Sequence, residues 1–178
     1  MLRIGYLLAA CAALACGGAI AQDAPAAPTG PCDDEAYHQF DFWVGDWEVT
    51  DRAGQLQGTN SITREEGGCL LVERWTSAAG NTGQSYNFYS PVNDEWRQVW
   101  VSAGLIIDYT GGLTETGSMK LTGTIVYHQS GTRAPFTGEW TPNPDGSVTQ
   151  HFEQYSADKD EWVEWFTGIY RRNESDNL

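Results

Sequence analysis

The sequence has little positive charge and no apolar run long enough to cross a membrane. Its 178 residues include 10 lysine and arginine residues against 24 aspartate and glutamate residues, giving a formal net charge of −14. Nucleic-acid backbones and anionic lipid surfaces both attract basic proteins, so both partners are disfavoured. The apolar stretch at residues 4–15 is shorter than the roughly twenty residues that span a bilayer. No integral membrane segment is expected in the mature chain.

The first twenty-one residues have the pattern of a secretory signal peptide. Arg3 supplies the positive end, residues 4–15 form the apolar core, and an Ala-Ile-Ala cleavage site ends at Ala21. We therefore expect a mature protein of 157 residues in the periplasm or outside the cell. Lipid attachment at Cys16 is the alternative, disfavoured because the residues before it match a lipoprotein box poorly.

Cysteine is scarce in the mature chain, which keeps only Cys32 and Cys69. Two thiols in an oxidising compartment predict one disulfide, which would contribute about 2–4 kcal/mol. The chain has no C-x-x-C pair and no histidine at ligand spacing, so a metal site is not predicted. It also lacks G-x-S-x-G, H-E-x-x-H and a phosphate-binding glycine loop, which disfavours nucleophilic catalysis.

What the chain does contain is a series of short β-rich runs, each bounded by Gly, Pro, Asn or Asp. We expect ten strands, at 45–51, 56–65, 69–77, 84–90, 95–102, 105–111, 118–127, 132–141, 147–156 and 161–172. Successive hairpins without crossovers predict an all-β fold, an antiparallel up-and-down barrel of about ten strands. A β-sandwich is the alternative.

The mature chain has the size of one domain. Residues 22–31, rich in alanine and proline, predict a flexible leader, and residues 174–178 a disordered tail. Residues 32–173 form the expected barrel domain. Acidic residues at 33–35 predict the start of a short helix through residues 37–40, which we expect to cover one end of the barrel.

The first expected strand opens with Gly45-Asp46-Trp47. Gly45 permits a tight turn into the strand, and Trp47 is predicted to point inward and form the barrel floor. In a closed meander the first and last strands are neighbours, so Arg171 is predicted to lie over Trp47 as a cation on a ring. The alternative is that Arg171 and Arg172 are simply solvated at the chain end.

Twenty-two residues are aromatic, and most of them must belong to the core. In the hairpin around Pro91, antiparallel register places one set of alternating side chains on a common face. We predict that this face is lumenal, since amides between indoles suit a ligand pocket; the opposite face is the alternative. The predicted lumenal set is Ser85, Asn87, Tyr89, Trp96, Gln98 and Trp100.

Other strands place polar residues beside large apolar ones. The candidate ligand-binding residues therefore also include Glu73, Trp75 and Gln150. Two carboxylates, those of Glu73 and Asp108, are candidate catalytic groups. A carboxylate inside a barrel must be paired, hydrogen-bonded or protonated. For each of these carboxylates, a solvent-facing position is the alternative. No cofactor is predicted; haem bound through His151 in the penultimate strand is the alternative.

Four segments together resemble a group of exported bacterial proteins of unassigned function with an F-D-F-W-x-G-x-W motif. They are residues 40–47 (FDFWVGDW), 67–75 (GGCLLVERW), 86–91 (YNFYSP) and 96–101 (WRQVWV). That group looks lipocalin-like, within the calycin superfamily. The resemblance implies a ten-stranded barrel similar to fatty-acid-binding proteins and haem-binding nitrobindins, and implies no settled activity.

Three functions fit these features. The first is an exported protein that binds a small apolar or aromatic ligand in the barrel lumen. The second is an isomerase, cyclase or hydrolase that uses a lumenal carboxylate. The third is an extracytoplasmic interaction module whose barrel is filled by its own aromatic side chains. The sequence does not indicate the oligomeric state.

Overall fold

The structure is a computed structural model that describes residues 30–173. The predicted signal peptide with its cleavage site after Ala21, the alternative lipid site at Cys16, residues 22–29 of the leader and the tail at 174–178 lie outside the described residues. Within residues 30–173, no helix has the length and apolarity needed to cross a membrane.

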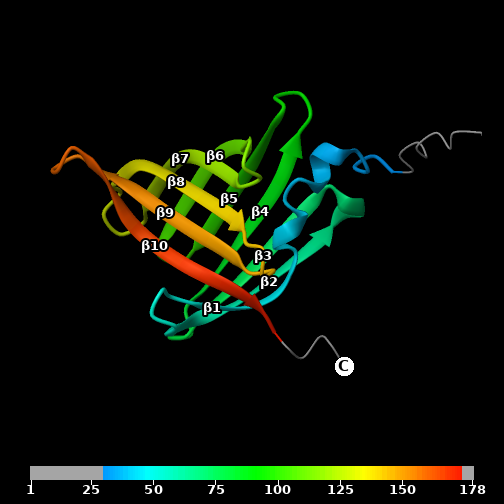
Figure 1. Cartoon of the computed structure of the whole chain (residues 1–178). Coiled ribbons are helices and arrows are strands. Elements are labelled where there is room, and N and C mark those ends of the chain that lie inside the picture. Colours follow the sequence, from blue (N-terminus) through cyan, green and yellow to red (C-terminus); the bar gives the residue numbers. More distant parts are fainter. Residues whose placement is uncertain (1–29, 174–178) are drawn as a thin grey trace, which may run out of the picture.

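The chain folds into a closed antiparallel barrel in which each strand pairs with the next along the chain and the last pairs with the first (Figure 1). The strands are β1 (Gly45–Thr50), β2 (Leu56–Glu65), β3 (Leu70–Ser77), β4 (Thr82–Ser90), β5 (Glu95–Ser102), β6 (Leu105–Leu113), β7 (Met119–Tyr127), β8 (Arg133–Pro142), β9 (Val148–Ser156) and β10 (Glu161–Arg172). The predicted up-and-down barrel is confirmed, and every predicted boundary lies within two residues of the observed one.

The hairpin turns explain why the boundaries were visible in the sequence. Gly54 and Gly146 sit in turns with φ of 81° and 80°, a region that favours glycine. Asp94 adopts a φ of 55° in the turn between β4 and β5. Because short turns connect neighbouring strands throughout, the barrel closes without a crossover.

Two short 3-10 helices, η1 (Glu35–His38) and η2 (Asp41–Trp43), replace the single predicted helix. They lie at one end of the barrel, on the right in Figure 1, beside the turns that join β2 to β3 and β4 to β5. We call this the closed end. The predicted disulfide is confirmed, since Cys32 is bonded to Cys69 and so ties the segment before η1 to the start of β3.

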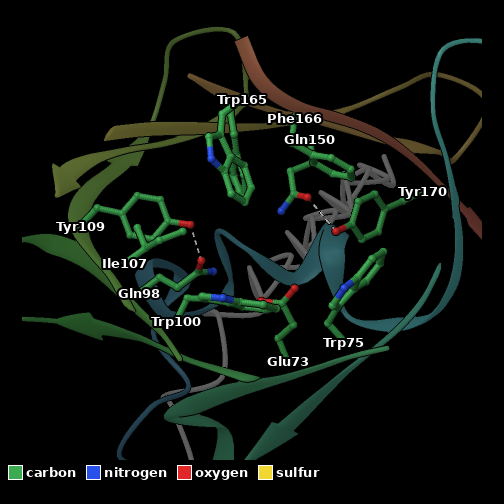
Figure 2. A pocket seen from close by; sticks show the side chains of 11 residues that line it. Glu73, Trp75, Gln98, Trp100, Ile107, Tyr109, Gln150, Trp165, Phe166 and Tyr170 are labelled. Atoms are coloured by element: carbon green, nitrogen blue, oxygen red, sulfur yellow. Dashed lines mark hydrogen bonds between the residues drawn. The ribbon is translucent and has the colours of Figure 1, made fainter. Parts of the chain in front are cut away.

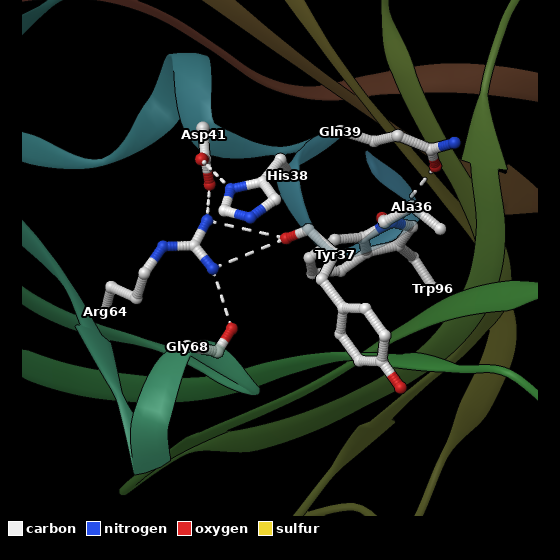
Figure 3. Close-up of polar contacts among 8 residues, drawn as sticks. All are labelled: Ala36, Tyr37, His38, Gln39, Asp41, Arg64, Gly68 and Trp96. Atoms are coloured by element: carbon white, nitrogen blue, oxygen red, sulfur yellow. Dashed lines mark hydrogen bonds and ion pairs between the residues drawn. The ribbon is translucent and has the colours of Figure 1, made fainter. Parts of the chain in front are cut away.

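Polar contacts hold this segment on the barrel (Figure 3). The Arg64 guanidinium forms an ion pair with Asp41 and donates hydrogen bonds to the backbone carbonyls of Gly68, at 2.7 Å, and Tyr37, at 3.4 Å. The indole N–H of Trp96 on β5 donates to the Ala36 carbonyl at 3.2 Å. Two strands thus bind the backbone of the helical segment directly.

Below these contacts, aromatic rings fill the closed end. We call this group the aromatic plug, and its members are Phe40, Trp43, Trp47, Trp96 and Trp140. Phe40 stacks on Trp43 with ring centroids 4.9 Å apart, and Trp140 packs edge-on against Phe40 at 5.3 Å. All three rings are fully buried. Among the described residues, packed and buried rings therefore close this end of the barrel.

Trp47 points into the barrel, as predicted, but the arginine that lies over its ring is not the predicted Arg171. Trp47 is fully buried, and its indole N–H donates to the Trp43 carbonyl at 2.9 Å. The guanidinium over its ring is that of Arg172, 4.4 Å from the ring centroid, instead of that of Arg171. The cause is the register of β1 and β10, which pairs Trp47 with Arg172 and turns Arg171 to the opposite face. Gly45 has a φ of 138° and leaves the space that the Arg172 guanidinium occupies.

Candidate functional site

The barrel contains a cavity of about 170 Å³, whose lining side chains are drawn in Figure 2. Its lining residues are Glu73, Trp75, Gln98, Trp100, Ile107, Tyr109, Gln150, Phe152, Trp165, Phe166 and Tyr170. Trp165 is 42% exposed, so the cavity reaches solvent beside it. We call this side of the barrel the open end, and none of the described helices covers it.

The predicted register of the hairpin around Pro91 is confirmed. Tyr89 pairs with Trp96, Asn87 with Gln98 and Ser85 with Trp100. The predicted face also points inward, because Ser85, Asn87 and Gln98 are at most 1% exposed. On the opposite face Tyr86 is 49% exposed and Val101 is 45% exposed. Alternation along the two strands therefore grouped these side chains correctly, and the amides between indoles identified the inward set.

Polar side chains form a continuous hydrogen-bonded layer at the floor of the cavity. We call this layer the polar belt, and its members are Asn60, Glu73, Ser85, Asn87, Gln98, Tyr109, Gln150 and Tyr170. One arm runs from the Tyr109 hydroxyl through the Gln98 and Asn87 amides to the Ser85 hydroxyl. Each group in this arm donates to the next, so the bonds polarise one another toward the last acceptor.

That last acceptor is the carboxylate of Glu73. Ser85 Oγ donates to its Oε2 at 2.6 Å, and Asn60 Nδ2 donates to its Oε1 at 2.7 Å. Burial raises the pKa of Glu73 from 4.5 to about 7, although the two hydrogen bonds act in the opposite direction. Desolvation therefore outweighs hydrogen bonding, and Glu73 exchanges its proton near neutral pH.

Asn60 provides a partner for either protonation state of Glu73. Its Nδ2 also donates to the Tyr170 hydroxyl at 3.2 Å, whereas its Oδ1 is buried and has no hydrogen-bond partner among the described residues. A half-turn of the amide would exchange Nδ2 and Oδ1, and the protonated Glu73 would then donate to Oδ1.

Two tyrosines supply hydroxyl donors on either side of the cavity floor. Burial, followed by the charge of Glu73, raises the pKa values of Tyr109 and Tyr170 well above their ordinary value, so both hydroxyls stay protonated. Tyr170 donates to Gln150 Oε1 at 2.8 Å. The Gln150 amide nitrogen points into the cavity in Figure 2 and makes no hydrogen bond within the described residues. It is therefore a donor for a bound molecule.

Aromatic rings surround the space above the polar belt. We call them the aromatic wall, and its members are Trp75, Trp100, Phe152, Trp165 and Phe166. The Trp100 ring lies against Gly83, where an added Cβ would come within 2.2 Å of the ring. Trp75 likewise lies against Gly58, with a corresponding distance of 2.7 Å. The glycines let these rings lie flat on the barrel wall and leave the lumen open.

A β-bulge adds an extra ring to the wall. The register of β10 against β9 shifts between Glu164 and Phe166, so Trp165 has no partner in the pairing. Trp165 and Phe166 are adjacent in sequence, yet both line the cavity. Regular alternation would have placed only one of them inside.

The structure brings five of the nine predicted ligand-binding residues to the cavity. They are Glu73, Trp75, Gln98, Trp100 and Gln150. Ser85 and Asn87 lie beneath them in the polar belt. The other two are at the closed end, where Trp96 belongs to the aromatic plug and the Tyr89 hydroxyl donates to Asp94 at 2.5 Å.

Asp108, the second candidate catalytic carboxylate, and His151, the alternative haem ligand, are on the outer face of the barrel. Asp108 lies between the inward-facing Ile107 and Tyr109 and forms an ion pair with Arg97 at 2.7 Å. His151 lies between two cavity residues of β9, so alternation turns its ring outward, where its Nδ1 is 2.9 Å from the Thr167 hydroxyl. Neither side chain lines the cavity.

The prediction of site residues omitted six lining residues: Ile107, Tyr109, Phe152, Trp165, Phe166 and Tyr170. Alternation would have identified Phe152, two positions after Gln150, and the Ile107 and Tyr109 pair, once the inward face of each strand was known. The bulge at Trp165 has no comparable signal in the sequence.

No group of three or more histidine, cysteine, aspartate and glutamate side chains in residues 30–173 is arranged to bind a metal ion. The chain matches no protein-family model, and the curated proteins include none with a similar sequence. The geometry of the cavity is therefore the basis for assigning a function.

Proposed function

We propose that this protein is an exported binding protein that holds one small, partly apolar ligand in the barrel cavity. The observation that carries the proposal is a cavity with aromatic sides and a polar floor, reached from solvent at the open end. Ligand sites have this composition, with apolar walls for affinity and a few polar groups for orientation.

The volume limits the size of the ligand. A cavity of about 150 Å³ in another protein holds a benzene molecule. The cavity of about 170 Å³ here therefore suits a molecule of one ring, or of a similar number of atoms in a branched chain. Affinity would come from burial of apolar ligand surface at roughly 25 cal/mol per Å², less the cost of association.

Export is part of the proposal. The signal-like pattern of residues 1–21 supports it, and so does the disulfide between Cys32 and Cys69, because disulfides persist in oxidising compartments. We further propose that the chain belongs to the lipocalin-like exported proteins that its motifs resemble. The closed barrel is compatible with that assignment.

A pair of matched variants tests the location of the site. Ile107→Trp places an indole in the cavity, whereas Val101→Trp places one on the outer face of the neighbouring strand. Isothermal titration with phenol and toluene should show one-site binding to the wild type and to Val101→Trp. Ile107→Trp should lose at least tenfold in affinity. Equal binding by both variants would place the ligand elsewhere.

Acid–base catalysis in the same cavity is a second candidate function. Glu73 favours it, since it lines the cavity and has a pKa of about 7, which suits a group that both gives and accepts a proton. NMR of a bound ligand after incubation separates the two functions. A binding protein returns the ligand unchanged, while an enzyme converts it and loses turnover in Glu73→Gln.

A further inference from the structure

Glu73 is a buried carboxylate without a cationic partner. It is 3% exposed, and its two hydrogen-bond donors, Asn60 and Ser85, are neutral. The eleven lining residues of the cavity, all within the described chain, include no lysine, arginine or histidine. An ionised carboxylate in such a place is costly unless a positive charge joins it.

The carboxylate keeps room for such a partner. An ionised carboxyl group has about four acceptor positions, and the polar belt uses two of them. Figure 2 shows the Glu73 carboxylate between the indoles of Trp75 and Trp100, pointing toward the centre of the cavity. The remaining acceptor positions are therefore available to a molecule in the cavity.

The rings around this carboxylate favour a positive charge as well. The face of an indole or phenyl ring carries negative potential and attracts cations, most strongly where water is excluded. The members of the aromatic wall enclose the space above Glu73. A formal net charge of −14 further draws cations toward the protein.

We propose that the ligand of the cavity is a small organic ammonium ion. Its cationic head lies against Glu73 and the faces of Trp75 and Trp100, and its apolar groups contact the rest of the aromatic wall. The Gln150 amide donates to a hydroxyl or carbonyl oxygen of the same molecule. This assignment rests on the proposed function, because it names the class of ligand that the cavity binds.

Two ligands of the same shape and different charge test the proposal. Choline is a quaternary ammonium alcohol, and 3,3-dimethylbutan-1-ol replaces its nitrogen by carbon. Isothermal titration of the wild-type protein at pH 8 should give at least tenfold tighter binding of choline. This comparison needs no variant, so a folding defect cannot obscure it.

Two variants that each remove one negative charge identify the group responsible. Glu73→Gln removes the carboxylate in the cavity, and Asp108→Asn removes one on the outer face. Glu73→Gln should lower the preference for choline over the neutral alcohol several-fold, to the part that the ring faces contribute. Asp108→Asn should keep that preference within twofold of the wild type.

Each other outcome overturns the ammonium assignment in a distinguishable way. If the neutral alcohol binds the wild type as tightly as choline, the site selects shape without charge. If phenol or toluene binds and choline does not, the binding function stands and the ligand class is wrong. If none of these probes binds, the ammonium assignment and the proposed function both fail.

Discussion

The two ends of this barrel are built from the same kinds of side chain and have opposite properties. At the closed end, Phe40 and Trp43 arrive from outside the barrel and pack with Trp140 into a solid group of rings. At the open end, Trp75 and Trp100 lie against glycines and surround a cavity. Aromatic content alone therefore does not distinguish a core from a ligand site.

The difference comes from what lies beside the rings. The closed end gains a segment, held by the disulfide and by Arg64, that supplies two of the rings filling it. The open end has no such segment among the described residues, and its wall meets the plug at Phe152, whose ring centroid lies 5.3 Å from that of Trp140. We therefore expect that the closed end contributes most to the free energy of unfolding and that the open end contributes to ligand binding.

The largest difference in the free energy of unfolding should appear between two single variants, each of which removes one indole from one end of the barrel. Trp140→Ala empties a fully buried site, and we expect it to lower the free energy of unfolding by about 3–5 kcal/mol. Trp165→Ala removes a ring that is 42% exposed, so a cost of about 1 kcal/mol is expected. Urea denaturation of both variants measures this difference. Equal losses would show that the two ends share the stability evenly.

A smaller effect should appear in the dependence of stability on pH. Folding raises the pKa of Glu73 from 4.5 to about 7, so the folded state binds this proton more tightly than the unfolded state. The contribution of protonated Glu73 to the free energy of unfolding is complete below about pH 4.5. It is lost as the pH rises through about 7, a change of about 3 kcal/mol.

Glu73→Gln cannot titrate and should lack this part of the pH dependence. Urea denaturation at pH 4.5 and pH 8 measures it, and Asp108→Asn controls for the loss of one charge. An identical decrease in the wild type and Glu73→Gln would mean that Glu73 ionises as freely in the folded protein as in the unfolded chain.

The smallest effect concerns the two arginines at the end of β10. Arg172 lies over the Trp47 ring, so Arg172→Met should lower the free energy of unfolding by about 0.5–1 kcal/mol. Arg171 faces away from Trp47, and Arg171→Met should change it by less than about 0.5 kcal/mol. Thermal unfolding of the two variants provides the comparison. A larger loss in Arg171→Met would contradict the observed register.

Features that depend on local chemistry were predictable from the sequence. Turn residues such as Gly54 and Gly146 marked the strand ends, and alternation oriented the hairpin of Asn87 and Gln98. Glu73 was found because a carboxylate stands beside Trp75 in a strand. The pairing of Cys32 with Cys69 followed because the mature chain has only these two cysteines.

Features that depend on register between distant strands were not predictable. Arg171 and Arg172 are equally plausible partners of Trp47 until the pairing of β1 with β10 is known. The inward face of β6 excluded Asp108, and that face depends on the neighbouring strands. The bulge that turns Trp165 inward is a local departure from alternation, which a pattern of period two cannot reveal.

The contacts of Gly83 and Gly58 with Trp100 and Trp75 have a consequence for the evolution of the barrel. A methyl group at Gly83 would push the Trp100 indole into the lumen, and one at Gly58 would displace both Trp75 and the backbone of β3 at Thr76, so either change would reshape the space available to a guest molecule. Ligand preference in such a barrel can therefore diverge through residues that never touch the ligand. Comparisons of related barrels need to include the small residues behind the rings as well as the rings themselves.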